Sequence, residues 1–185
     1  GIFVLLLIMI MSALSSCGSM FTGTVTTTMA STYLSLPAEI DAADLSFTEK
    51  EMELQNKIDR IETDYPGYDE YRYNIDAIEH DPYVLISMLS ALHEGAGTVD
   101  EVQGTLQSLF EKQYILTEEV VVEERYYYET DTWTDDEGNT HTDRYRVYYD
   151  YYISYVTLEN FNLSHVPIYT MSEEQLSRYA LYMAT

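Results

Sequence analysis

The strongest polar and apolar pattern in the chain lies between residues 114 and 161, where two segments alternate with a period of two residues. In residues 116–132 the apolar residues and tyrosines fall mostly on even numbers, and in residues 140–158 they fall mostly on odd numbers. Such alternation is typical of half-buried strands. Between the segments, residues 135–139 form a turn-forming cluster in which Gly138 adopts positive φ without strain. The pattern predicts one long, tyrosine-rich β-hairpin.

A four-residue loop at 136–139 fixes the expected register of this hairpin. One face then pairs its apolar residues as Val120 with Tyr155, Val122 with Ile153, Tyr126 with Tyr149 and Tyr128 with Val147. The other face gains three ion pairs, each contributing about 0.2–1 kcal/mol: Asp131 with Arg144, Glu129 with Arg146, and Arg125 with Asp150. A shift of one residue would turn the apolar face toward water.

Helical spacing of apolar residues precedes the hairpin. A capping box of Thr48 and Glu51 predicts a helix over about 48–64, ended by Pro66 and Gly67. After the N-cap Asp81 and the following proline, residues 83–93 are almost wholly apolar, which predicts the central helix of the core. Thr98 and Glu101 form a second capping box and open a helix that runs to about residue 110.

The remaining segments complete the expected fold. Residues 68–74 are interpreted as a polar, aromatic connector, and residues 162–169 as a short edge strand that tolerates Pro167. Ser172 with Gln175 caps a last helix. The predicted class is α+β: two to three helices packed on a long antiparallel hairpin, with a C-terminal helix. This helix stops in mid-turn at Thr185, so we expect the natural polypeptide to continue.

The N-terminal segment has a different composition. Residues 2–11 are an unbroken apolar run, so residues 1–21 are predicted to be a membrane anchor or signal segment. The chain begins at Gly1 without basic residues, and we expect the true N-terminus to precede it. Residues 14–17 also resemble a bacterial lipobox, which makes Cys17 a candidate for lipidation; an uncleaved span and a cleaved signal remain alternatives. Residues 22–45 are the expected Ser/Thr-rich linker, and residues 46–185 the domain outside the cytoplasm.

Charge and residue types limit the chemistry. The formal net charge is -23, from 32 acidic and 9 basic residues, which argues against a nucleic-acid partner because phosphate binding needs a cationic face. A single cysteine excludes an intrachain disulfide. The four histidines show no metal-binding spacing, so no catalytic residue, cofactor or metal ligand is predicted.

The hairpin offers the candidate binding residues. Its acidic tip at 135–139 is interpreted as a solvated turn rather than a calcium loop. Trp133, the only tryptophan, lies near that tip. If exposed beside tyrosines, it is suited to stack on a sugar or anchor a protein partner; burial against the linker is the alternative. Trp133, Tyr148 and Tyr152 are the candidate partner-binding residues.

Four segments carry a resemblance to a known family: residues 78–87 (IEHDPYVLIS), 98–110, 113–117 (QYILT) and 151–164. They resemble the N-terminal region of membrane-anchored cell-wall hydrolases encoded by conjugative transposons and related elements of Gram-positive bacteria. The resemblance implies a downstream NlpC-type peptidase domain with a Cys nucleophile and a His base. No position of this chain matches that catalytic motif.

Three functions follow as hypotheses. The first is a non-catalytic, extracytoplasmic spacer that positions a wall peptidase, with the membrane as its anchor. The second is a module whose tyrosine-rich hairpin binds peptidoglycan or a protein of the conjugation machinery, and the third is an enzyme such as a glycosidase. The spacer hypothesis requires Val120, Val122, Tyr126 and Ile153 to be buried, and it excludes a deep cleft where histidine and carboxylate side chains meet. The oligomeric state is not predicted.

Overall fold

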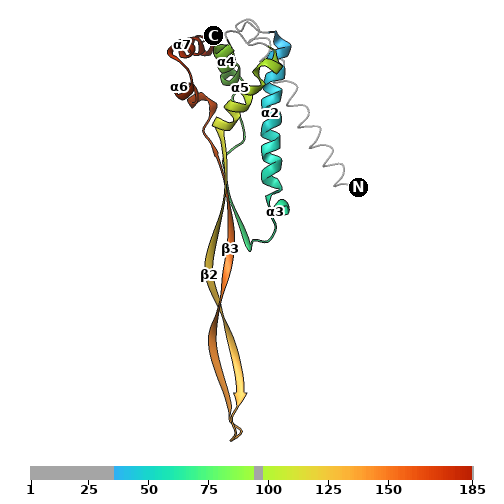
Figure 1. Cartoon of the computed structure of the whole chain (residues 1–185), viewed down its shortest axis with the longest axis vertical. Coiled ribbons are helices and arrows are strands. Elements are labelled where there is room, and N and C mark those ends of the chain that lie inside the picture. Colours follow the sequence, from blue (N-terminus) through green and yellow to red (C-terminus); the bar gives the residue numbers. More distant parts are fainter. Residues whose placement is uncertain (1–35, 94–97, 185) are drawn as a thin grey trace, which may run out of the picture. The chain divides into compact units, whose positions relative to one another are not determined.

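A computed structural model describes residues 36–93 and 98–184 and confirms an α+β fold (Figure 1). Its elements are, in order, α2 (Pro37–Asp59), α3 (Ile61–Asp64), β1 (Glu70–Ile75), α4 (Pro82–His93), α5 (Val99–Gln113), β2 (Tyr114–Thr134), β3 (Thr140–Asn160), the 3-10 turn η1 (Leu163–His165), α6 (Pro167–Thr170) and α7 (Glu173–Met183). The predicted anchor and Cys17 lie outside the described residues. Within those residues, no helix combines the length and the apolar character needed to cross a membrane.

The described chain divides into two compact units. The first, called the helical unit, consists of residues 36–57, 77–93, 98–114 and 160–184. The second, called the sheet unit, consists of residues 58–76 and 115–159. Each unit has its own buried residues.

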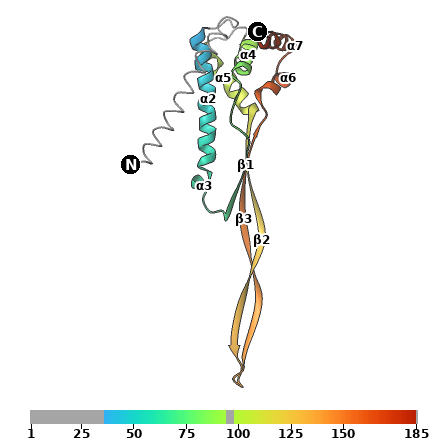
Figure 2. The same cartoon turned by 180° about the vertical axis from the view of Figure 1, so that it is seen from behind.

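The core of the helical unit is built around α4. As its all-apolar sequence predicts, α4 buries Leu85, Met88 and Leu89 completely. The Asp81 carboxylate accepts the N–H groups of Tyr83 and Val84, which confirms the predicted N-cap. α5 adds three buried apolar side chains, Val102, Leu106 and Leu109, and α7 packs against α4 (Figure 2). The capping boxes that open α5 and α7 are both present, as predicted.

The helix predicted over 48–64 begins earlier than expected. α2 starts at Pro37, and Ile40, Ala43 and Phe47 are buried at helical spacing along it. It therefore includes the last nine residues of the segment expected to be a linker. Thr48 lies inside the helix, where its hydroxyl donates to the Asp44 carbonyl, so the predicted capping box there is wrong.

The edge strand predicted over 162–169 is also wrong. Asn162 adopts a positive φ of 49°, and its side chain accepts a hydrogen bond from the Ser164 N–H, which starts the short turn η1. Pro167 then occupies the start of α6, a position that needs no N–H donor. Local turn chemistry therefore overrides the strand tendency of this segment.

Two 21-residue strands, β2 and β3, form the predicted hairpin, but its register differs by one residue from the prediction. The Asp135 N–H donates to the Asn139 carbonyl and the Gly138 N–H donates to the Asp135 carbonyl, which closes a three-residue loop at 136–138. Gly138 has a φ of 85°. Beyond the other end of the strands, the Phe161 N–H donates to the Gln113 carbonyl in the same register.

The corrected register places different residues opposite each other. Tyr145 donates to Glu129, Arg146 donates to Tyr128, and Trp133 stacks on His141. The three predicted ion pairs are not formed, because even-numbered residues of both strands now share one face and odd-numbered residues share the other. Each face consequently mixes tyrosines with charged residues.

A third strand, which the sequence pattern did not reveal, supports only the base of the hairpin. β1 lies parallel to β3, with Glu70 beside Ile153 and Ile75 beside Leu158, in the order β1-β3-β2 (Figure 2). β3 buries three apolar residues along this stretch, Ile153, Val156 and Leu158. Beyond β1, toward the tip, the sheet has only two strands.

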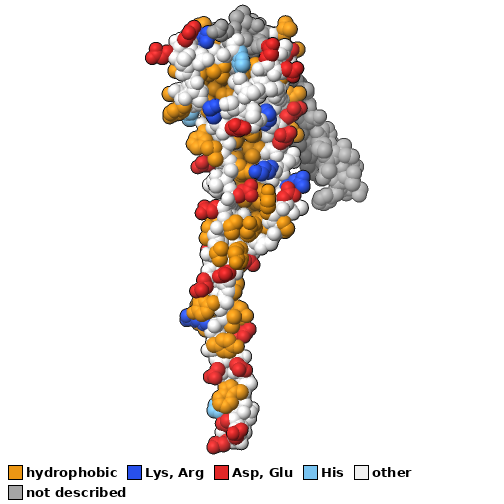
Figure 3. Space-filling view, in the orientation of Figure 1, with side chains coloured by type: hydrophobic (Ala, Val, Ile, Leu, Met, Phe, Trp, Pro, Cys, Tyr) orange, Lys and Arg blue, Asp and Glu red, His pale blue; other side chains and the backbone are white. Residues whose placement is uncertain are grey.

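Burial differs between residues of the hairpin. Ile153 is fully buried, as expected, but Val120 is 46% exposed, Val122 50% and Tyr126 48%. The prediction of a covered apolar face is therefore wrong for these three residues. Figure 3 shows apolar and tyrosine side chains at the surface, interspersed with acidic ones.

Candidate functional site

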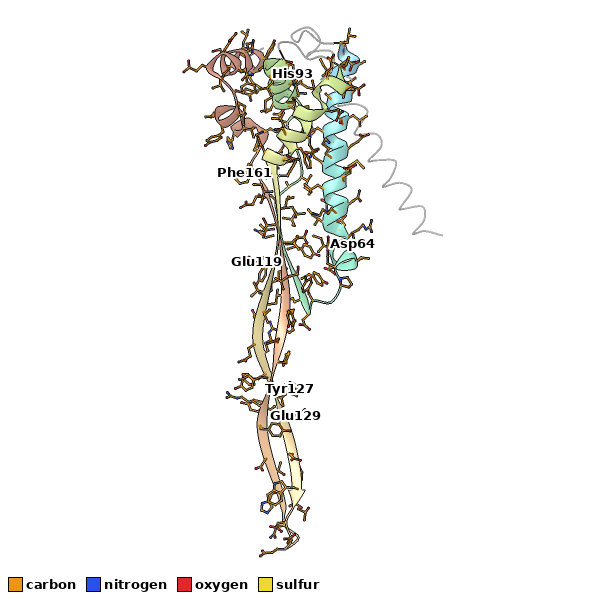
Figure 4. All side chains as sticks on the ribbon, in the orientation of Figure 1. Asp64, His93, Glu119, Tyr127, Glu129 and Phe161 are labelled. Atoms are coloured by element: carbon orange, nitrogen blue, oxygen red, sulfur yellow. The ribbon has the colours of Figure 1, made fainter. Side chains whose placement is uncertain are left out.

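The main candidate site is the part of the hairpin formed by residues 120–152, which we call the hairpin arm; except at its base it has two strands. It exposes a valine pair and many aromatic side chains on its two faces: Val120, Val122, Tyr126, Tyr127, Tyr128, Trp133, Tyr145, Tyr148, Tyr149 and Tyr152. Tyr127 and Glu129 extend side by side from β2, linked by a hydrogen bond of 3.2 Å (Figure 4). Apolar surface of this extent is the usual mark of a binding surface.

The structure does not bring the three candidate partner-binding residues together. Tyr148 and Tyr152 are exposed on the even-numbered face, where the Tyr148 ring contacts that of Tyr126 with centroids 5.8 Å apart. Trp133 is exposed on the odd-numbered face near the tip, stacked on His141 with centroids 4.4 Å apart. A partner that covers one face contacts either the tyrosine pair or the tryptophan.

Arginine side chains hold several of the rings in place. The Arg125 guanidinium lies 3.4 Å from the centroid of the Tyr151 ring, and that of Arg144 lies 3.9 Å from the Tyr128 ring. Such contacts contribute about 0.5–1 kcal/mol at exposed sites. They orient the tyrosines on a surface over which no described residue packs, which lowers the entropy cost of binding.

The tip is an ordered turn. Asp135 accepts hydrogen bonds from the backbone N–H groups of Glu137 and Asn139, the Asn139 amide and His141. The bond from His141 and those from Asn139 lower the pKa of Asp135 to about 2. Across the described residues, no cluster of three or more possible metal ligands occurs. The carboxylate is thus used to order the turn.

A buried polar cluster in the helical unit was not anticipated from the sequence. The His80 ring donates to Asp44 on one side and to Glu51 on the other, each at 3.0 Å, and its side chain is only 6% exposed. Burial by itself would lower the pKa of His80, but the hydrogen bonds and charges of the two carboxylates raise it to about 9. His80 is therefore an imidazolium at neutral pH.

The cluster extends to the start of the hairpin. The Tyr114 hydroxyl donates to Glu51, and burial together with this bond raises the pKa of Tyr114. The Gln113 amide donates to the Glu79 carbonyl and to the Asn160 side chain, and Asn160 donates to the Ala77 carbonyl. These bonds join α2, the segment before α4, and the two residues where the hairpin leaves and re-enters the helical unit.

This cluster has the residue types of an acid-base site but not its accessibility. A catalytic base needs a substrate proton within hydrogen-bond reach, whereas both ring nitrogens of His80 are occupied inside the unit. Its contacts join separate segments, and we assign it a structural role. Because its members lie far apart in sequence, spacing alone gave no signal for it.

A surface cavity of about 320 Å³ lies elsewhere in the helical unit, between α4, α5 and α6. Its polar lining includes His93, Thr105 and Lys112, and the His93 ring lies 2.8 Å from the Thr105 hydroxyl. His93 ends α4, as labelled in Figure 4. The described residues that line this cavity include no carboxylate.

No protein-family model, curated protein or solved structure matches this chain.

Proposed function

We propose that this chain is a non-catalytic, extracytoplasmic domain of a membrane-anchored peptidoglycan hydrolase used in conjugative transfer, and that its hairpin arm binds a partner. The assignment to such an enzyme is supported by the resemblance to cell-wall hydrolases of conjugative transposons. Four segments carry this resemblance: residues 78–87, 98–110, 113–117 and 151–164. Membrane attachment is supported by the apolar run at residues 2–11. A peptidase domain beyond residue 185 would supply the chemistry.

The exposure of the arm is the single observation that favours binding over passive spacing. A spacer needs a covered apolar face, but Val120, Val122 and Tyr126 are about half exposed. Two strands alone are marginally stable in water, and three or more strands with an apolar face are the usual minimum. A partner that covers the arm supplies the missing layer.

The partner class is a protein of the conjugation machinery. Tyrosine, tryptophan and arginine are the residues that most often dominate protein interfaces, and the arm contains many tyrosines, three arginines and the chain's only tryptophan. A wall glycan is the second candidate, supported by the flat, exposed Trp133 and His141 stack. Anionic wall polymers are disfavoured by the chain's net charge of -23.

Site-specific photocrosslinking tests this proposal in cells that express the full chain. A photoreactive residue replaces Trp133 in one variant and Tyr148 in another, so that each face of the arm is sampled. A matched control carries it at Met52, an exposed apolar residue of α2. We expect the arm positions to give one or two defined products, identified by mass spectrometry, that the Met52 position does not give.

Two results would count against the proposal. Equal, diffuse crosslinking at all three positions would leave the arm without a specific partner. A purified chain that solubilises peptidoglycan by itself would contradict the non-catalytic assignment. The gene sequence beyond codon 185 is the direct test of the parent enzyme, since we expect a cysteine peptidase motif there and a stop codon shortly after Thr185 would oppose it.

A further inference from the structure

The outer edge of β3 has open backbone groups directly beyond β1. Odd-numbered residues form the hydrogen-bonded pairs between β2 and β3, as at Asp135 and Asn139, so even-numbered residues of β3 direct N–H and C=O groups outward. β1 occupies this edge at the base, where the Tyr152 and Leu158 carbonyls accept from Asp69 and Asp76. The Asp69 carboxylate also accepts the Tyr152 N–H at 2.8 Å, which ends the third strand.

We propose that a second copy of this chain pairs with the open edge of β3, antiparallel over residues 144–150, with a two-fold axis at Val147. The sequence of this segment, RYRVYYD, is complementary to itself in that register. Arg144 lies opposite Asp150 of the second copy, Arg146 lies opposite Tyr148, and Tyr145 lies opposite Tyr149. Each contact occurs twice, as two-fold symmetry requires.

Pairing would give hydrogen-bond partners to the backbone N–H and C=O groups that point outward from β3. The four even-numbered residues between 144 and 150 would exchange about eight backbone hydrogen bonds with their counterparts, and the two-stranded arm would become part of a four-stranded sheet. Asp150 has no cationic partner among the described residues, and Arg144 contacts only the Tyr128 ring there. The new contact gives each a partner of opposite charge.

Charge distribution selects β3 rather than β2 as the interface. Residues 140–150 contain two arginines and two aspartates, whereas residues 120–134 contain four acidic residues and one arginine. In the paired sheet the two acidic β2 strands would be outermost and about 14 Å apart, beyond the screening length of about 8 Å at physiological salt. Pairing through β2 would instead bring the acidic strands together.

Disulfide trapping tests the register in the full chain with Cys17→Ser as background. Val147 falls in a non-hydrogen-bonded pair across the new interface, where Cα atoms are about 4.5 Å apart and a disulfide fits. Val147→Cys should therefore give a covalent dimer under mild oxidation. Tyr127→Cys is the matched control, because Tyr127 lies opposite Val147 in the hairpin at the same level of the arm but on β2.

Charge reversal then tests the pairing itself. Arg144→Asp places two carboxylates opposite each other at both symmetric contacts, and we expect dimerisation about tenfold weaker. Asp150→Arg should weaken dimerisation to a similar degree, because it places two guanidinium groups opposite each other at both contacts. The double variant Arg144→Asp, Asp150→Arg restores complementarity and should recover the trapped dimer, a recovery that a folding defect would not show.

The proposal is overturned if Val147→Cys dimerises no more than Tyr127→Cys, or if the double variant fails to recover. Both outcomes concern self-association alone. They are separate from the capture of a heterologous partner by the aromatic faces, which remain exposed in the four-stranded sheet.

Discussion

The helical unit and the hairpin arm use apolar side chains in opposite ways. In the helical unit, α4 buries Leu85 and Leu89 completely, and α5 contributes a further buried row. In the arm, Val122 and Tyr148 are each about half exposed, although these residues are as apolar or aromatic as those of the core. Composition alone therefore does not identify the interior of the protein. The number of layers that pack on a segment decides whether its apolar side chains are buried.

The largest expected difference between the two regions is the cost of removing apolar atoms. Leu85→Ala should destabilise the protein by about 2–5 kcal/mol, because it leaves a cavity in the core. Val122→Ala should change stability by no more than about 0.5 kcal/mol, as for other surface substitutions. Denaturant unfolding followed by circular dichroism measures both, and similar losses for the two variants would contradict the assignment of the arm as free surface.

The buried imidazolium makes the helical unit sensitive to pH. The pKa of His80 rises from 6.5 to about 9 on folding, so its contribution is complete below about pH 6.5 and is lost as pH rises through 9. At about 1.4 kcal/mol per pKa unit, the loss is on the order of 3 kcal/mol. His80→Gln should therefore flatten the dependence of the unfolding free energy on pH over this range. A slope that persists in His80→Gln would show that another group titrates.

Glycine-to-alanine substitution should change stability in opposite directions in the two regions. Gly138→Ala places a side chain at a φ of 85°, which costs about 1–2 kcal/mol and should loosen the tip of the arm. Gly104→Ala lies in α5 with nothing within 4 Å of the added Cβ, and should stabilise the helical unit by about 0.5–1 kcal/mol. Hydrogen exchange resolved by residue distinguishes the two effects, and equal signs would count against the described turn.

Substitution of Tyr148 should have a small effect on stability but a large effect on partner binding. Tyr148→Ser should alter unfolding free energy by about 0.5 kcal/mol or less, because the ring is exposed. It should nevertheless reduce crosslinking through a photoreactive residue at Tyr152, which is exposed on the same even-numbered face. Crosslinking through position 133, on the other face, serves as the internal comparison, and unchanged capture at both positions would remove Tyr148 from the binding surface.

Local sequence signals predicted the helical unit best. The apolar run of α4, its Asp81 cap and the capping boxes at Thr98 and Ser172 are all present, because each depends on neighbours within about four residues. The start of α2 was misplaced because Thr48 and Glu51 fit a capping box, while burial of Ile40 and Phe47 extends the helix toward Pro37. Tertiary packing outweighed the local signal there.

The sheet unit was predicted as a hairpin but not in detail. Its register depends on whether the turn has three or four loop residues, and Gly138 supports both until its hydrogen bond to Asp135 is seen. β1 was missed because its partner lies about eighty residues away and parallel pairing leaves no local pattern. The candidate residues Trp133 and Tyr148 are exposed, but the one-residue change of register places them on different faces.

The hairpin has the same register at its two ends, between Asp135 and Asn139 and between Gln113 and Phe161, and this gives the arm a simple rule of length. Removing one residue from each strand shortens it by about 3.4 Å and exchanges the two faces beyond the cut. Removing two from each strand shortens it by about 7 Å and keeps every remaining side chain on its face. Natural variants of this protein should therefore differ in reach by even, matched deletions or insertions, so that evolution adjusts the distance spanned without redesigning the surface presented.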